Sequence, residues 1–471
     1  MPRRKPAIFV PGFPGSSLEL PGGRKLFPPP LDALLRHKKE ILDRLRAPDD
    51  PALDDGVRVR SPIRYSFQIP LLDLGKEAQS LYDLLEDLGY DTGQGNDFIP
   101  VGWDWRMPVD HPPTLLALEA AIRDLSEFHH GKVVAIVHST GGLVLRALLE
   151  SRPHLARQIE RIIAIGVPWA GLIKSFRYAA VGEAVRFGPL TLMTAKESRQ
   201  TLGRAWAAYD LLPPHPEVLR DEQGEMGFFT AGGAVTSPLV ERRWIRPGLE
   251  HVHPRVDRSM ERFGHRQRWF AIDDEIEVTS LVGWGAATET RCELLDKGPG
   301  RPPWFEITDD GDGTVPRRSA AWLEHSRRVP TLLIPIGWFG DQIITRQHSQ
   351  LWNSTPARAA LAHLLSGREK QPWVWAAADG DDAIDRRRRI RVRIVASDEK
   401  GRPLSRARAS VRIGSETTEV DLRERTRAVI EIGRTHLRPN IGTSFYRFEV
   451  RFEWEERGKA RRMDRPLIIQ T

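Results

Sequence analysis

A serine at a predicted strand-to-helix turn is the first residue of this chain whose setting could support chemistry. Ser139 lies in the segment HSTGG at residues 138–142, which follows an apolar run at residues 132–137 and precedes a helical pattern. Such a turn lifts a serine Oγ out of the sheet, and the helix that follows offers positive potential to a developing oxyanion. Val137 stands where the motif G-x-S-x-G has its first glycine. A plain turn with a serine cap is therefore the alternative interpretation.

Two further polar loops supply a candidate acid and a candidate base. Asp312 lies in an acidic segment at residues 309–316, and an aspartate in such a loop can accept a hydrogen bond from a histidine. A calcium loop is the competing interpretation, although the segment lacks the later glycine and closing glutamate of the EF-hand pattern. His348 follows the last predicted strand, whereas His325 lies where a helix is expected to end. His348 is therefore the preferred base.

These three residues occur in the chain order of the catalytic triad in α/β-hydrolases. Each follows or lies near the end of a predicted strand, where a parallel sheet presents its catalytic groups. In that chemistry His348 takes the proton from Ser139, Asp312 orients and compensates His348, and backbone amides receive the oxyanion. The order of the residues therefore predicts a serine hydrolase.

Alternating strands and amphipathic helices are expected to position these residues. The order of the elements predicts a parallel sheet with right-handed crossovers and a site at the carboxyl ends of its strands. An irregular insertion at about residues 172–265 either covers the site as a lid or acyl pocket or completes the core. The predicted strands are residues 7–10, 98–101, 132–137, 161–167, 269–272 and 331–336, and the predicted helices are residues 31–45, 77–88 and 115–128.

One loop is predicted to support the site without taking part in the reaction. Asp104, Trp105 and Arg106 follow the strand predicted at residues 98–101. An aspartate and an arginine buried beneath tryptophan rings would hold this loop rigid. We therefore expect structural support from these three residues.

Composition restricts the classes of function. The 471 residues are 40% hydrophobic and 28% charged, and the net charge is +7 with 63 acidic residues. No basic stripe interleaved with aromatic residues indicates nucleic-acid binding, and peripheral contact with a lipid surface stays open. Cys292 is the single cysteine, so an intramolecular disulfide and a thiolate metal cluster are excluded. No metal, cofactor or membrane span is expected, and the absence of a signal-peptide pattern favours a cytoplasmic location.

Several segments together resemble the lecithin:cholesterol acyltransferase family. They occur in the family's order and cover roughly residues 6–365. The resemblance implies an α/β-hydrolase that forms an acyl-enzyme from an ester lipid and passes the acyl group to water or an alcohol. It also implies that the amides of Phe13 and Thr140 form the oxyanion hole, since Pro14 has no N–H. The segments are residues 10–19, 104–106, 138–142, 168–171, 211–213, 311–316 and 348–349.

The chain is expected to have two domains. Residues 1–370 would form the α/β-hydrolase catalytic domain, with the insertion inside it. At residues 385–471, short stretches of alternating apolar and polar residues predict an antiparallel β-sandwich. A basic face there could meet anionic membrane or could protect solvated edge strands. A catalytically silent scaffold with a binding β-module is the alternative function, and the oligomeric state stays open.

Overall fold

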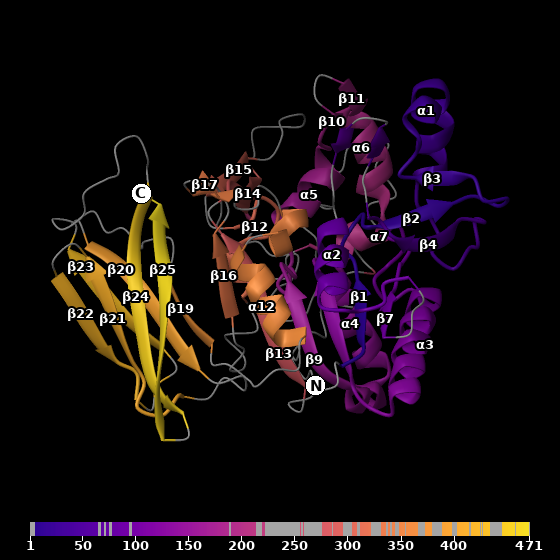
Figure 1. Cartoon of the computed structure of the whole chain (residues 1–471). Coiled ribbons are helices and arrows are strands. Elements are labelled where there is room, and N and C mark those ends of the chain that lie inside the picture. Colours follow the sequence, from indigo (N-terminus) through magenta and orange to yellow (C-terminus); the bar gives the residue numbers. More distant parts are fainter. Residues whose placement is uncertain are drawn as a thin grey trace.

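The structure is a computed structural model (Figure 1). Within the part of the chain that it describes, no helix has the length and apolar character needed to cross a membrane. The described residues are 5–64, 67–69, 72–74, 78–93, 97–187, 190–212, 219–221, 255, 258, 276–284, 286–294, 304–308, 311–321, 331–335, 338–339, 342–343, 348–353, 355–365, 373–378, 389–397, 403–413, 416–423, 425, 427–433, 445–456 and 458–470.

A six-stranded parallel sheet forms the centre of the molecule, with the strand order β16-β13-β9-β8-β1-β7. Every residue of β1 and β8 is buried, as their continuous apolar sequences require of strands covered on both faces. The parallel sheet predicted from the sequence is thus confirmed. The strands are β1 (Ala7–Val10), β7 (Phe98–Pro100), β8 (Val133–His138), β9 (Ile159–Ile165), β13 (Glu277–Trp284) and β16 (Thr331–Pro335).

Helices cover both faces of this sheet. Alternate residues of a strand point to opposite faces, and β1 shows this directly. Ile8 and Val10 belong to a hydrophobic cluster with α3 and α4, whereas Ala7 and Phe9 belong to a second cluster with α2 and α12. The chain therefore has an α/β-hydrolase-like fold. The helices are α2 (Gln79–Asp87), α3 (Pro112–His129), α4 (Gly141–Ser151) and α12 (Thr355–Leu365).

Further short elements surround the sheet, and many of them lie together at the upper right of Figure 1. They are β2 (Ser16–Glu19), β3 (Lys25–Phe27), α1 (Leu31–Leu45), β4 (Arg58–Pro62), β5 (Phe67–Ile69), β6 (Leu72–Leu74), η1 (Pro153–Gln158), α5 (Ile173–Ala180), β10 (Val185–Phe187), β11 (Leu190–Met193), α6 (Ala195–Thr201), η2 (Leu202–Arg204), α7 (Trp206–Asp210), β12 (Leu219–Asp221), β14 (Thr288–Leu294), β15 (Trp304–Thr308), α10 (Arg317–Ala320), β17 (Trp338–Phe339), β18 (Gln342–Ile343) and η4 (His348–Asn353).

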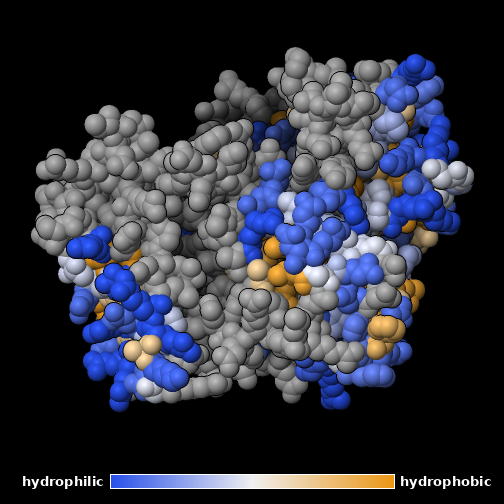
Figure 2. Space-filling model, in the orientation of Figure 1, coloured by the Kyte–Doolittle hydropathy of each residue, from blue (hydrophilic) through white to orange (hydrophobic). Residues whose placement is uncertain are grey.

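The C-terminal strands form two antiparallel sheets at the left of Figure 1. Ile394, Val411 and Phe452, from both sheets, share one buried cluster. The described surface here is mostly hydrophilic (Figure 2), and Arg406 pairs with Glu455 at 2.7 Å. The strands are β19 (Trp373–Ala378), β20 (Arg389–Ser397), β21 (Arg408–Ile413), β22 (Glu416–Asp421), β23 (Arg427–Gly433), β24 (Phe445–Glu456) and β25 (Lys459–Gln470).

Most predicted elements of the catalytic region are confirmed, with one omission. The strand at residues 7–10 and the helix at residues 31–45 have the predicted bounds. The sequence did not predict β13, in which buried Thr279 and Ser280 interrupt the apolar pattern. The strand predicted at residues 269–272 lies outside the described residues. His325 and the first residues of the competing calcium loop lie outside them as well.

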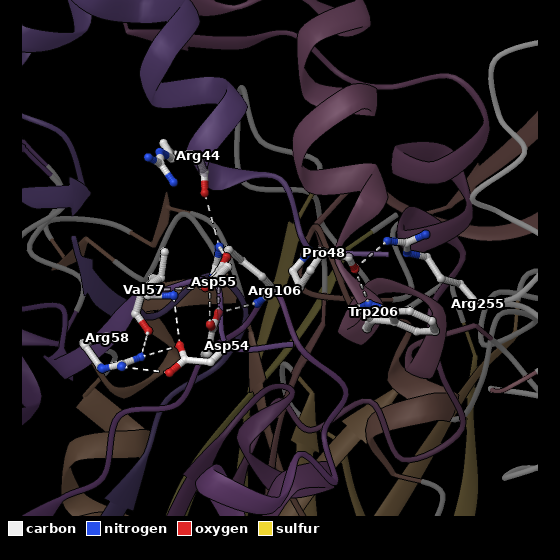
Figure 3. Close-up of polar contacts among 11 residues, drawn as sticks. Arg44, Pro48, Asp54, Asp55, Val57, Arg58, Arg106, Trp206 and Arg255 are labelled. Carbon is white, nitrogen blue, oxygen red and sulfur yellow. Dashed lines mark hydrogen bonds and ion pairs between the residues drawn. The ribbon is translucent and has the colours of Figure 1, made fainter. Parts of the chain in front are cut away.

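A buried ion network fixes the loop after β7 to an earlier part of the chain (Figure 3). Arg106 is fully buried and pairs with Asp104 at 2.7 Å and with Asp55 at 2.6 Å. It also donates to the carbonyl of Arg44 at 3.2 Å. Burial alone would lower the pKa of Arg106, but the two carboxylates outweigh it and raise that pKa. The network therefore holds a permanent, compensated charge between segments that are far apart in the sequence.

Replacing Arg106 with Met should lower the free energy of unfolding by about 3–5 kcal/mol, because the buried Asp104 carboxylate loses its counter-charge. Urea denaturation measures this change. Arg58→Met is the matched control, since the Arg58–Asp54 pair is exposed and its loss should leave stability nearly unchanged. Equal effects of the two substitutions would contradict a structural role for the Arg106 network.

Candidate active site

Ser139 occupies a sharp turn between β8 and α4. Its backbone has φ of 50°, a left-handed conformation that costs energy for any residue other than glycine. The turn is held because the Ser139 amide donates to the Ile165 carbonyl at 2.9 Å. Gly141 permits the close crossing of β1, since a Cβ there would lie 2.3 Å from the Val10 carbonyl oxygen. Val137, which stands in place of the first glycine of the motif, is buried in β8 and pairs with Val10.

Asp312 and His348 are brought together from segments 36 residues apart. His348 Nδ1 lies 2.6 Å from Asp312 Oδ2. The other carboxylate oxygen accepts from the amides of Thr314 at 3.0 Å and Val315 at 2.7 Å. Both oxygens are therefore engaged, and the carboxylate is 1% exposed. Because a carboxylate accepts, Nδ1 of His348 carries the proton and Nε2 has the free lone pair of a base.

Ser139 and Nε2 of His348, between which a proton would be transferred, share one cavity but are not hydrogen-bonded to each other. Nε2 of His348 is buried and has no hydrogen-bond partner among the described residues. Ser139 and His348 both line a cavity of about 380 Å³. Catalytic hydrogen bonds are often long in a ligand-free site and tighten when substrate binds. The arrangement can thus support transfer of the Ser139 proton to His348.

The cavity also contains both predicted oxyanion donors. Phe13 and Thr140 line it, and neither backbone amide has a hydrogen-bond partner within the described ranges. The loop of Phe13 lies directly on the serine, since a Cβ on Gly12 would be 2.6 Å from Ser139 Cβ. Two free amides beside a serine Oγ can stabilise a tetrahedral oxyanion. Mostly apolar side chains complete the walls, among them Ile63, Leu172, Tyr178, Leu202 and Leu211.

The loop after β7 supports the Phe13 loop through its indoles. Trp103 donates from Nε1 to the Pro11 carbonyl at 2.9 Å, and its amide donates to Ser16 Oγ at 3.0 Å. Trp105 donates to the Ser16 carbonyl at 3.1 Å, and its ring meets the Phe13 ring edge to face at 5.4 Å. Sequence reasoning expected the tryptophan rings to hold this loop, but it did not predict the hydrogen bonds of Trp103 and Trp105 to Pro11 and Ser16. The available signal was that buried indole N–H groups need acceptors.

A second histidine, also missed in the sequence, lies beside the base. His138 is 7% exposed, and its ring lies 4.8 Å from that of His348 between centroids. Burial, and secondarily the charge of His348, lower the pKa of His138 well below its ordinary value. This shift favours the neutral form of His138.

Comparison with known proteins decides the family. The family model described as Lecithin:cholesterol acyltransferase matches residues 54–231. The human (Homo sapiens) protein named lysosomal phospholipase A and acyltransferase is 30% identical over 339 residues, which cover 66% of this chain and 74% of the relative. The chain belongs to the lecithin:cholesterol acyltransferase family. The resemblance read from the sequence is thereby confirmed.

One further relative and one solved structure are similar to parts of this chain. The rat (Rattus norvegicus) protein of the same name is 30% identical over 283 residues, covering 55% of this chain and 62% of the relative. The chain thus spans about three fifths of the length of that relative. A chain in the crystal structure of the Tle4-Tli4 complex covers 77% of this chain and 97% of its own length, at 16% identity and a TM-score of 0.48. That distant likeness carries no inference.

The names of these family members correct one expectation. Both relatives are named as lysosomal proteins. The cytoplasmic location expected from the sequence is therefore wrong. It rested on the lack of a recognisable signal peptide in this sequence, which is a weaker indication than the relatives.

Replacing Trp103 with Phe should lower kcat about 10-fold and change KM less than about 2-fold, because the Phe13 loop loses its hydrogen bond at Pro11 while the pocket keeps its shape. Steady-state hydrolysis of a p-nitrophenyl ester measures both constants. Trp454→Phe, in a C-terminal strand, is the control and should leave both constants unchanged. A loss confined to KM would argue against support of the oxyanion donors.

His138 should make the free energy of unfolding of the chain depend on pH. Below the ordinary histidine pKa of 6.5 the unfolded chain binds a proton that folded His138 does not, so the free energy of unfolding falls as pH drops. The contribution of one such group is at most about 1.4 kcal/mol per pH unit. Urea denaturation between pH 7 and pH 5 should show a shallower dependence for His138→Gln. His154→Gln, at an exposed site, should follow the wild type, and an unchanged slope in His138→Gln would refute the assignment.

Proposed function

We propose that this chain is a serine-dependent ester-lipid hydrolase or O-acyltransferase that works through an acyl-enzyme. The observation that carries the proposal is the 2.6 Å pair of Asp312 and His348 in the cavity that contains Ser139. Membership of the lecithin:cholesterol acyltransferase family and the names of the relatives, phospholipase A and acyltransferase, support the lipid substrate. The mostly apolar walls suit an acyl chain.

The proposed reaction begins with attack by Ser139. Its Oγ forms a bond to the ester carbonyl carbon while Nε2 of His348 takes the Oγ proton, and Asp312 stabilises the resulting imidazolium. The amides of Phe13 and Thr140 would bind the oxyanion of the tetrahedral intermediate. The C–O bond to the alcohol then breaks, and His348 gives its proton to the leaving oxygen. Ser139 is left as an acyl ester.

The second half of the reaction repeats these steps with a new nucleophile. Water or an alcohol gives its proton to Nε2 of His348 and attacks the acyl ester. Collapse of the second tetrahedral intermediate returns the proton to Ser139 Oγ. Water as the acceptor makes the reaction a hydrolysis, and an alcohol makes it an acyl transfer. Both outcomes use the same groups of the chain.

We also propose the domain organisation expected from the sequence. Residues 1–370 would form the catalytic domain, with a lid or acyl pocket at about residues 172–265, and residues 385–471 would form an accessory β-sandwich. The strand β19, at residues 373–378, precedes residue 385 but pairs with β20 of this sandwich. Leu172, Tyr178 and Leu211 support the first assignment because they line the cavity. The buried cluster shared by the two C-terminal sheets supports the second.

The enzyme is favoured over a silent scaffold with a binding β-module. The silent interpretation was motivated by Val137 at the serine turn and by the additional C-terminal domain. Val137 is buried in β8 and pairs with Val10, while Ser139 has the left-handed φ that a nucleophile turn uses. The departure from the glycine motif therefore no longer argues against catalysis.

Ser139→Ala should lower kcat by about 10⁴-fold or more, because the nucleophile is lost while the pocket is kept. A fluorophosphonate probe should label the wild type at Ser139 and leave this variant unlabelled. Ser151→Ala, at the other end of α4, is the matched control and should retain labelling and turnover. A lipid panel with and without added alcohol, with acyl products identified by mass spectrometry, distinguishes hydrolysis from transfer. Full hydrolysis by Ser139→Ala would exclude the proposal.

A further inference from the structure

We infer that His138, the residue before Ser139, is a positioning residue that holds the base His348 in register with the nucleophile. The inference rests on the proposed function, in which His348 accepts the serine proton. His138 touches no reacting atom in this scheme. It acts through the placement of His348.

The first contact is a hydrogen bond to the backbone of the base. Nε2 of His138 lies 3.2 Å from the carbonyl oxygen of His348, across 210 residues of sequence. A carbonyl oxygen only accepts, so His138 carries its proton on Nε2. This bond links the backbone of the base directly to the residue that precedes the nucleophile.

The second contact is between the rings. The His138 and His348 rings are tilted by 33° with centroids 4.8 Å apart. The Trp352 ring also contacts the His138 ring, with centroids 4.8 Å apart and an interplanar angle of 78°. Trp352 is 2% exposed and lies in η4 with His348. The His138 ring thus packs against two residues of η4.

These contacts supply constraints that Asp312 cannot. The carboxylate holds one atom of the imidazole, Nδ1, and a single hydrogen bond leaves rotation of the ring about that atom. His138 fixes the backbone carbonyl of His348 and covers a face of its ring. The two residues together define where Nε2 points. A displacement of about 1 Å at such an atom can cost about 10²-fold in rate.

His138 also contacts the loop that carries Phe13. A Cβ on Gly12 would lie 3.2 Å from His138 Nδ1 and 2.6 Å from Ser139 Cβ. One ring therefore packs against the oxyanion loop and the base and is covalently adjacent to the nucleophile. Its neutral state suits this position, because burial lowers the pKa of His138 and a second imidazolium would repel the one that forms on His348.

Two substitutions separate the hydrogen bond from the packing. His138→Phe keeps a planar ring and loses the donor, so we expect kcat to fall about 10-fold with KM within about 2-fold of the wild type. His138→Gln keeps an N–H donor at similar reach, so we expect it to retain most of kcat. The rate of fluorophosphonate labelling at Ser139 should follow kcat in both variants. His154→Phe, at an exposed site, is the control and should match the wild type.

The outcomes decide between this inference and a merely structural role. Equal kcat in His138→Phe and the wild type, or equal losses in His138→Phe and His138→Gln, would overturn the inference. If thermal denaturation shows that His138→Phe does not fold, His138→Asn replaces it, because its shorter amide cannot reach the His348 carbonyl. Asn should then fall below Gln in kcat, and equality would again overturn the inference. If the wild-type chain is neither labelled by the probe nor active, the proposed function itself is wrong. That result differs from the variant results that would overturn the inference about His138.

Discussion

The structure depends on one strained turn at the end of β8. A serine in the left-handed conformation costs about 1–2 kcal/mol. Contacts with the neighbouring strands β9 and β1 offset this strain. The amide of Ser139 is bound by the end of β9, and Gly141 lets α4 start where β1 ends. The same close approach brings the Phe13 loop onto the serine. The turn therefore fixes Ser139, the start of α4 and the loop of Phe13 together.

Buried polar side chains whose hydrogen-bonding groups and charges have partners hold the loops next to this turn. Trp103 and Trp105 bind the carbonyls of the oxyanion loop through their indoles, and Arg106, on the same loop, carries a charge compensated by two carboxylates. An unpaired buried charge or donor would cost several kcal/mol. Because each group has partners in a distant segment, the native arrangement is the one in which all are satisfied. The polar network thus specifies the loop geometry that apolar packing alone would leave open.

Much of the fold could be predicted from the sequence, because the spacing of apolar residues within each strand and helix indicates which type of element forms. The buried strands β1 and β8 and the amphipathic α1 show the period that their burial requires. The strand β13 was missed because Thr279 and Ser280 are polar, and only the neighbouring strands explain their burial. The three residues that we propose as a triad, Ser139, Asp312 and His348, were predicted from their residue types and their order in the chain. The roles of Trp103 and His138 were not found, because they depend on contacts between segments far apart in the chain.

Two kinds of constraint therefore meet at the site. The position of Ser139 is set locally, by a strand, a turn and a glycine that the sequence displays. The position of His348 is set at a distance, by Asp312 at one ring nitrogen and by His138 at its backbone and ring face. His138 is also the neighbour of Ser139, so any shift of the turn would move the support of the base with it. His138 therefore links the proposed nucleophile, its neighbour in sequence, to the proposed base, which lies 210 residues further along the chain.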